Sequence, residues 1–429
     1  MERKELIDWI WLSETIGRSG FVFRKLLSRF DRPNELYAAD EETIRKIPNL
    51  TERNIAALMQ KDQSAAVKIL DDCERLGISV LPYGSGQYPR ILHEIADPPP
   101  LLYAAGKIPD FENSFCVAMV GTRKMSEAGM QNAYRLSWEL SSSGALVISG
   151  LAEGIDGVCA VGAIQGGGKT VAVVGCGLDI AYPAHHGKLM NRIVATGGAI
   201  FSEYPPGTPP AQFHFPIRNR IISGLSQIVI VVEAGMSSGS LITAREAFSQ
   251  GKKVFAVPAD PDTHSADGNN KLLQDGAQVV LESRDILERF RYAFPDRQLS
   301  DRIKPLLGGA DRAVLREYGV IGFETPELPR QKEARQPKQT GGSAKVPKVT
   351  EAPKTAAPEA KAPSVIPDEL LQSLDPVQLA VLEAMPDDFP VVPENIRTGY
   401  SLGEVMAALT ILEVLGIVRK LPGSMYGKT

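Results

Sequence analysis

The sequence predicts an α/β protein built on a doubly wound parallel sheet, with helices covering both faces of that sheet. Two observations predict this class. Between residues 112 and 290, short runs rich in β-branched residues alternate with helical segments. Several of those helical segments end at a glycine, such as Gly144, Gly166 and Gly251, as helices commonly do.

The strands and helices of this central region follow one another in the rhythm of a parallel sheet. We expect strands at the apolar runs Cys116–Val120, Leu146–Ser149, Thr170–Val174, Gln227–Val232, Lys253–Val257 and Gln278–Leu281. We expect helices between them at Glu127–Ser141, Ile155–Gln165, Leu241–Ser249 and Asn270–Asp275. Parallel strands need such crossover helices, so the sheet domain is assigned to residues 76–290.

Smaller domains are predicted on either side of the sheet. Residues 1–75 carry apolar residues at three-to-four spacing with glycine and proline breaks, a pattern similar to small helix-hairpin-helix or SAM-like bundles. Residues 366–429 predict two helices and a hairpin, a small winged helix. Its last helix, 401–415, has two glutamates and no lysine or arginine, which favours protein contact over reading of duplex DNA.

A linker joins the sheet domain to the winged helix, and it is assigned to residues 291–365. Residues 325–366 contain seven prolines and no aromatic residue. Within residues 330–361, eight basic residues face three acidic ones. Such a composition buries too little apolar surface to offset the entropy of ordering, so we expect partial disorder. The segment is a plain spacer or an electrostatic tether for nucleic acid.

Composition excludes several classes of protein. The chain has 429 residues, with 47 Lys and Arg against 51 Asp and Glu, a net charge of −4, so it is not a globally basic nucleic-acid binder. Its four cysteines form no C-x-x-C pair, and we predict neither a metal site nor a cofactor. No apolar run approaches membrane-span length and no signal peptide is recognised, so we expect a cytoplasmic protein without membrane contact.

Loops at the carboxyl ends of the predicted strands carry the candidate binding residues. Doubly wound sheets bind ligands at these ends. Gly121, Thr122 and Arg123 follow the first strand directly, and they offer a tight turn, a hydroxyl and a guanidinium. The turn Ser238-Gly239-Ser240 opens a later helix, where backbone N–H groups and hydroxyls can bind an anion.

A third motif places aromatic and cationic residues together at the start of a helix. Phe215 is followed by Arg218, Asn219 and Arg220. Aromatic rings can stack on bases while guanidinium groups hold phosphates, a combination typical of single-strand binding. The alternative is that Phe213 or Phe215 only covers the sheet edge.

Three other motifs are rejected. The run 166–170 ends like a phosphate-binding P-loop, but it follows a helix and enters a strand, the reverse of the required order. Gly175-Cys176-Gly177 lacks the third glycine of a dinucleotide fingerprint. His185 and His186 have no metal-ligand neighbours, and we expect them on the surface at a helix start.

Taken in order, the motifs from residue 82 to 290 resemble those of the DprA/Smf family of DNA-processing proteins. The matching segments are Y-P-R-I-L, D-P-P-P-L-L-Y, V-G-T-R, S-G-L-A-E-G-I-D, G-L-D-I-A-Y-P, F-P-I-R-N-R-I-I-S-G-L-S, S-G-S-L-I-T-A-R-E-A, V-F-A-V-P and D-G-A. The sequence departs from the family at Ala160, Ala259 and Asn269, positions outside the candidate site.

The resemblance implies an extended Rossmann-like sheet domain that binds single-stranded DNA, forms a homodimer and loads the RecA recombinase during natural transformation. It implies no enzymatic activity. The rival hypothesis is a nucleotide-binding protein or phosphoribohydrolase on a related sheet, but alignment puts Thr243 where that motif has its catalytic glutamate. A third hypothesis, a purely structural adaptor, gives the cluster of Arg, Phe and Ser residues no purpose.

Overall fold

The structure is a computed structural model of the chain. It describes residues 1–290 apart from 49 and 261–263, and then 293–294, 306–322, 374–385, 396, 398–400, 402–415, 417–421 and 425–428.

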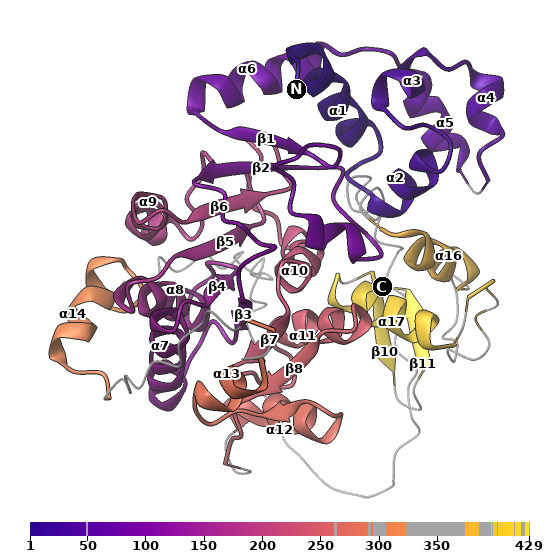
Figure 1. Cartoon of the computed structure of the whole chain (residues 1–429). Coiled ribbons are helices and arrows are strands. Elements are labelled where there is room, and N and C mark those ends of the chain that lie inside the picture. Colours follow the sequence, from indigo (N-terminus) through magenta and orange to yellow (C-terminus); the bar gives the residue numbers. More distant parts are fainter. Residues whose placement is uncertain are drawn as a thin grey trace, which may run out of the picture.

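A single nine-stranded sheet organises the molecule, in the order β1-β2-β6-β5-β4-β3-β7-β8-β9 (Figure 1). The strands are β1 Ser79–Pro82, β2 Leu101–Gly106, β3 Cys116–Val120, β4 Leu146–Ser149, β5 Thr170–Val174, β6 Ala199–Ser202, β7 Ile228–Val231, β8 Lys253–Ala256 and β9 Gln278–Val279. Neighbouring strands from β6 to β9 are parallel. Strand β2 is antiparallel to both β1 and β6. The sheet is therefore mostly parallel with an antiparallel edge.

Helices cover both faces of the sheet, as the sequence predicts. One face packs against α7 Glu127–Ser142, α8 Ile155–Gln165, α9 Gly187–Ala195 and α13 Arg284–Phe290. The other packs against α10 His214–Gly224, α11 Ser240–Ser249 and α12 Asp267–Gln274. Helix α8 is apolar almost all round because α7 and the sheet enclose it. Added to Gly162, a Cβ atom would lie 2.1 Å from Ser137 Oγ, so only glycine permits this close packing.

The predicted central strands are confirmed, whereas three strands lie outside the prediction. Strands β3, β4 and β5 have the predicted bounds, and β7, β8 and β9 are shorter by one or two residues. Strands β1, β2 and β6 are not among the predicted strands. The last two residues of β2 are Ala105 and Gly106, which have low strand propensity, and β6 is only four residues long. The antiparallel edge of the sheet is therefore formed by strands that the sequence pattern does not reveal.

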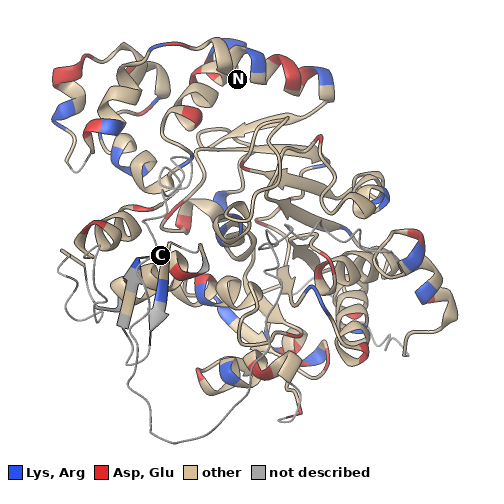
Figure 2. Cartoon of the chain, turned by 180° about the vertical axis from the view of Figure 1, so that it is seen from behind, with Lys and Arg blue, Asp and Glu red and all other residues tan. Residues whose placement is uncertain are grey.

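Among the described residues ahead of the sheet lie the helices α1 Arg3–Thr15, α2 Gly20–Leu27, α3 Pro33–Ala38, α4 Glu41–Arg45, α5 Glu52–Met59 and α6 Ser64–Leu76. Their buried side chains, among them Trp9, Phe23 and Leu58, form one core that also includes Leu101 and Tyr103 of β2. Lys and Arg alternate with Asp and Glu along these helices (Figure 2). The helices thus pack on the antiparallel edge of the sheet without forming a surface of a single charge.

Residues 306–322 belong to the packed protein, although the predicted linker includes them. Helix α14 Gly309–Glu317 places Leu315 and the following Val320 in the same core as α7 and α8. Tyr134 donates a hydrogen bond to Asp311 of this helix, at 2.8 Å. The packed region therefore extends past the predicted boundary at residue 290, and the low-complexity composition begins only after it.

At the C-terminal end, helices α16 Pro376–Ala384 and α17 Leu402–Val414 pack against the hairpin formed by β10 Val418–Leu421 and β11 Met425–Lys428. Helix α16 begins at the N-cap Asp375, which accepts a hydrogen bond from Gln378 N at 2.8 Å. These elements have the predicted types. Their assignment as a winged helix stays a prediction, as does the SAM-like assignment of residues 1–75.

The order in which the chain adds strands to the sheet reverses between β3 and β7. From β3 the chain proceeds outward through β4, β5 and β6, and it then crosses to β7 on the other side of β3 and proceeds through β8 and β9. The loops after β3 and β7 are therefore neighbours at the carboxyl edge, the switch point where doubly wound sheets bind ligands. A hydrogen bond joins the two loops, since Thr122 N donates to Glu233 O at 2.7 Å. The candidate residues lie around this switch point.

Candidate functional site

The helix that follows β3 has its N-terminus already occupied by a carboxylate. Glu233 Oε2 accepts hydrogen bonds from Ser126 N at 2.9 Å and from Ser126 Oγ at 3.0 Å. A Cβ atom on Gly129 would lie 1.7 Å from the same oxygen. This N-terminus is where a doubly wound dinucleotide-binding protein holds its pyrophosphate. Here the protein's own anion fills the position.

The loop after β4 is filled in a similar way by Asp156. Its carboxylate accepts hydrogen bonds from Gly150 N at 3.1 Å and from Ala152 N at 3.4 Å. Burial raises the pKa of Asp156, and the attraction of Arg218 opposes that shift. Leu151 in this loop has φ 57°, a left-handed conformation that a branched side chain rarely adopts. Strained backbone of this kind is concentrated at functional sites.

Arg218 lies beneath the surface of the same edge and is 4% exposed. It donates hydrogen bonds to Gly150 O, at 2.8 Å, and to Val173 O. Burial lowers the pKa of Arg218 to about 10, although Asp156 favours the charged form. Arg218 thus binds two strand ends together and contributes a positive field, rather than presenting a free guanidinium to solvent.

Phe215 lies at the centre of a stack of cationic and aromatic groups, here called the edge stack. The guanidinium of Arg123 lies 5.2 Å from the centroid of the Phe215 ring, and that of Arg218 lies 5.9 Å from it. Tyr182 stacks on Phe215 with ring centroids 5.3 Å apart and an interplanar angle of 28°. The structure therefore brings Arg123, Phe215 and Arg218 together, although they come from two distant parts of the sequence.

Asn219 connects the edge stack to the turn before α11. It lies four residues after Phe215 and so on the same side of α10. Asn219 Nδ2 donates to Gly239 O at 3.3 Å, and Ser238 Oγ lies 2.7 Å from Ser240 Oγ. The first turn of α11 contains no acidic residue. Unlike the starts of α7 and α8, this helix start holds no carboxylate of its own in its first turn.

The remaining residues of the first loop shape the backbone beneath Arg123. A Cβ atom on Gly121 would lie 2.6 Å from the side chain of Ile155, so the close approach of α8 requires glycine there. Thr122 Oγ1 accepts a hydrogen bond from Lys124 N at 3.2 Å, which closes the turn. Arg123 itself is exposed.

Arg220 is not brought into the edge stack. It is 6% exposed and forms a bidentate ion pair with Glu203, at 2.8 and 2.6 Å. Its Nε atom lies 2.9 Å from Asp97 Oδ2. Burial disfavours the charged form of Arg220, but the two carboxylates outweigh this effect and raise its pKa. Of the predicted phosphate contacts, Arg220 is the one whose charge is already neutralised inside the protein.

The expectation that His185 and His186 lie on the surface is wrong for His186. Its side chain is 0% exposed, and Nδ1 lies 3.0 Å from Leu151 O. Burial lowers the pKa of His186 to about 4. The physical reason is its position: the short 3-10 helix Ala184–His186 turns it inward against the loop after β4. His185 is half-buried, with Nε2 3.6 Å from Glu153 Oε1.

Tyr182, Glu233 and Asp156 take part in the site without having been predicted as site residues. Tyr182 precedes a proline in the loop after β5. The strand pattern alone is enough to place this loop at the carboxyl edge of the sheet.

Within the described residues, no group of three or more His, Cys, Asp or Glu side chains could hold a metal ion. The described helices include none long and apolar enough to cross a membrane. The edge offers stacking surfaces, the exposed guanidinium of Arg123 and an anion-suited helix start.

Comparisons with known proteins point to one family. A profile of the family described as DNA recombination-mediator protein A matches residues 79–291. Protein Smf of Synechocystis is 30% identical over 99% of both chains. DNA processing protein DprA of Streptococcus pneumoniae is 41% identical over 52% of this chain and 73% of that protein.

A solved structure agrees with these matches. The crystal structure of DNA processing protein A from Streptococcus pneumoniae superimposes with a TM-score of 0.58 at 34% identity, and it covers 66% of this chain and 97% of that one. The motifs from residue 82 to 290, the mostly parallel sheet and these relatives lead to the same conclusion: the chain belongs to the DprA/Smf family of DNA-processing proteins.

Proposed function

We propose that this protein binds single-stranded DNA, without sequence preference, along the carboxyl edge of its sheet. The observation that carries the proposal is the edge stack of Tyr182, Phe215 and Arg123. Every base has a π face, so stacking on such groups tolerates any sequence, while a guanidinium attracts the phosphates between the bases.

The distribution of charge at the edge indicates the path of the DNA phosphates across it. The starts of α7 and α8 are occupied by Glu233 and Asp156, which repel phosphate. The start of α11 has no acidic residue in its first turn and is joined to the edge stack through Asn219. We therefore infer that the phosphates run from Arg123 past Asn219 to Ser238, Gly239 and Ser240.

The rival hypothesis of a nucleotide-binding or hydrolytic enzyme has less support. The pyrophosphate position at α7 is taken by Glu233, through two hydrogen bonds to Ser126. Thr243, which aligns with a catalytic glutamate in the related hydrolases, is 1% exposed and has no ionisable group. We infer a binding protein that carries out no bond chemistry and needs no cofactor.

The family membership supports the wider part of the proposal. The matched family is described as DNA recombination-mediator protein A, so we propose that the protein loads RecA onto bound single strands during DNA uptake, with a homodimer as the working unit. A cytoplasmic location follows from that partner. The predicted winged helix is assigned no part in binding, because the described residues of α17 include Glu404 and Glu413 and no cation.

Fluorescence anisotropy with a labelled 30-nucleotide oligonucleotide tests the proposal. The purified full chain should bind the single strand and a scrambled strand of the same composition with equal affinity, and should bind the matching duplex more weakly. Equal affinity for duplex and single strand, or binding of one sequence only, would contradict it. Incubation with ATP or a nucleotide monophosphate should yield no hydrolysis product by chromatography.

A further inference from the structure

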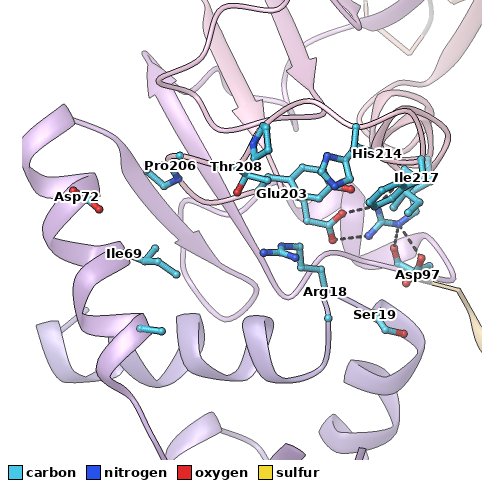
Figure 3. Close-up of a pocket in the computed structure, with 18 of the residues that line it drawn as sticks. Arg18, Ser19, Ile69, Asp72, Asp97, Glu203, Pro206, Thr208, His214 and Ile217 are labelled. Carbon is cyan, nitrogen blue, oxygen red and sulfur yellow. Dashed lines mark hydrogen bonds and ion pairs between the residues drawn. The ribbon is translucent and has the colours of Figure 1, made fainter. Parts of the chain in front are cut away.

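A cavity of about 670 Å³, here called the junction cavity, lies where the N-terminal helices meet the sheet (Figure 3). Its walls come from the turn between α1 and α2, from α6, from the loops before β2 and after β6, from the first turns of α10 and from the N-cap of α16. Loops far apart in the sequence thus enclose one space on the side of α10 away from the edge stack. The proposed function does not use it, and Arg220 is the one predicted site residue that lines it.

Arg18 gives the cavity a built polar wall. Its backbone has φ 64°, and Leu151 is the only other described non-glycine residue with a positive φ. Arg18 Nη2 donates to Glu14 Oε2 at 2.6 Å, and its guanidinium lies 5.2 Å from the centroid of the Tyr204 ring. Its Nε atom is buried and has no hydrogen-bond partner. A cationic side chain held by a carboxylate and an aromatic ring therefore forms one fixed wall of the cavity.

Flat and apolar surfaces complete the enclosure. His214 stacks on Tyr204 with ring centroids 3.9 Å apart, and a bond of 2.9 Å between His214 Nδ1 and Gly175 O fixes its ring. The apolar part of the lining is supplied by Ile69, Pro206 and Ile217. A space with stacked rings at one wall and aliphatic groups at others suits a planar group with a polar edge.

The charges that line the cavity argue against a phosphate. Its basic residues are Arg18, Lys68 and Arg220, and its acidic residues are Asp72, Asp97, Glu203 and Asp375. Arg18 and Arg220 are paired with carboxylates. With no cationic excess, a dianionic or monoanionic group would lose more hydration than it gains, whereas a neutral planar group would not.

The cavity and the edge stack share the start of α10. Phe213 and His214 line it, and the next residue along α10 is Phe215 of the edge stack. A hydrogen bond joins the loop after β5 to the loop after β6, since Gly177 N donates to Thr208 O at 2.9 Å. To reach the junction cavity, a strand lying on the edge stack would have to pass over the start of α10.

We propose that the junction cavity binds one nucleobase of the strand held at the edge stack, and that it accepts the base without its phosphate. The inference rests on the proposed function for the source of the base. A free nucleoside has the same planar, neutral chemistry, and the experiment below separates the two sources.

The test fills the cavity from its rim. Ala65 lies on α6, is exposed and lines the cavity, so Ala65→Trp should fold normally while occupying the space. Val67→Trp is the matched control, because Val67 is 37% exposed on the same helix and does not line the cavity. The probes are deoxythymidine oligonucleotides with a single 2-aminopurine at successive positions, and free deoxyadenosine as a competitor.

We expect 2-aminopurine fluorescence to change at one position beyond those affected by Phe215→Ala, and the change to disappear in Ala65→Trp. Loss of one enclosed base should weaken oligonucleotide binding about 5- to 50-fold. The salt dependence should stay the same, because no phosphate contact is removed. The smaller ring of Ala65→Phe should give an intermediate loss. Val67→Trp should bind as the wild type does.

Three outcomes would overturn the inference. Ala65→Trp could bind as tightly as Val67→Trp, or it could lower the salt slope, which would mean a phosphate enters the cavity. The third is that deoxyadenosine binds the wild type and is blocked in Ala65→Trp while no strand position responds, which would make a free nucleoside the ligand. Failure of the proposed function looks different, since the wild type itself would then bind no single strand.

Discussion

Helix α10 carries two arginines two positions apart, and the two sides of the helix use them in opposite ways. On one side, Arg218 donates to two strand-end carbonyls and supports an edge where Arg123 stays exposed. On the other side, Arg220 is neutralised by Glu203 and Asp97. The first arrangement leaves a positive field for a phosphate chain, whereas the second fixes the position of the helix. An arginine therefore indicates a phosphate site only where its carboxylate partners are absent or outnumbered.

The largest effect should come from breaking the buried pair on the second side. Arg220→Met leaves Glu203 as an uncompensated buried charge, which should lower the free energy of unfolding by about 3–5 kcal/mol. Urea denaturation followed by circular dichroism measures this change. The double variant Arg220→Met with Glu203→Leu should recover much of the loss. If Arg220→Met were as stable as the wild type, the ion pair would not be what holds α10.

A second effect concerns the two buried histidines, His186 after β5 and His214 at the start of α10. Burial lowers the pKa of both His186 and His214 to about 4, below the ordinary value of 6.5. The unfolded chain therefore binds more protons than the folded one between pH 6.5 and 4, so these groups contribute stability above pH 6.5 that is lost as the pH falls toward 4. Each contributes at most about 3 kcal/mol.

The melting temperature measured from pH 7 to pH 4 tests this effect. In His186→Asn the decrease in melting temperature over that range should be smaller than in the wild type. The exposed His264, whose side chain is 93% exposed, supplies the control, and His264→Asn should follow the wild-type curve. Parallel curves for His186→Asn and the wild type would mean that the buried ring does not titrate in this range.

A third effect sharpens the edge side of the comparison. Phe215→Ala removes the centre of the edge stack and should reduce the free energy of oligonucleotide binding by about 1–3 kcal/mol. The salt slope should not change, since stacking releases no counterions. Anisotropy titrations at several salt concentrations separate the two quantities. Unchanged binding together with a lowered melting temperature would assign Phe215 to the core alone, the alternative that the sequence left open.

The smallest effect is expected at the C-terminal end. Truncation after residue 322 keeps α14, whose Leu315 and Val320 pack in the sheet core, and removes the elements from α16 onward. We expect this variant to keep most of its single-strand affinity, apart from a modest contribution of the basic segment at residues 330–361. Loss of all binding in a folded truncation would place the DNA site at the C-terminal end instead.

Strand and helix patterns made much of the sheet predictable, because β-branched runs and glycine stops are local signals. The partners of Arg218 and Arg220 were not predictable, since both arginines occupy the same motif and look alike in the sequence. Glu203 lies 17 residues from Arg220, and Asp97 lies 123 residues from it. Which arginine meets carboxylates depends on the placement of β6 and of the loop before β2, and the antiparallel edge gave no clear sequence signal.

The same limit explains Tyr182 and His186. Each comes from the loop after β5, and only the crossing of α10 over the strand ends brings Tyr182 to Phe215. The exposure of a residue at a helix start depends on what packs above it. For His186 that partner is Leu151, from the loop after a different strand. Local pattern therefore predicted the loops of the site, whereas the contacts within it required the assembled sheet.

The salt dependence of single-strand binding in Arg123→Ala tests the central claim most directly. Arg123 is exposed at the edge stack, and Arg192, an exposed arginine on α9, is the matched control. Plots of log affinity against log salt concentration should show a slope smaller in magnitude by about 0.7 in Arg123→Ala, together with weaker binding, because one phosphate contact is lost. Arg192→Ala should match the wild type. An unchanged affinity and slope in a folded Arg123→Ala variant would contradict the account.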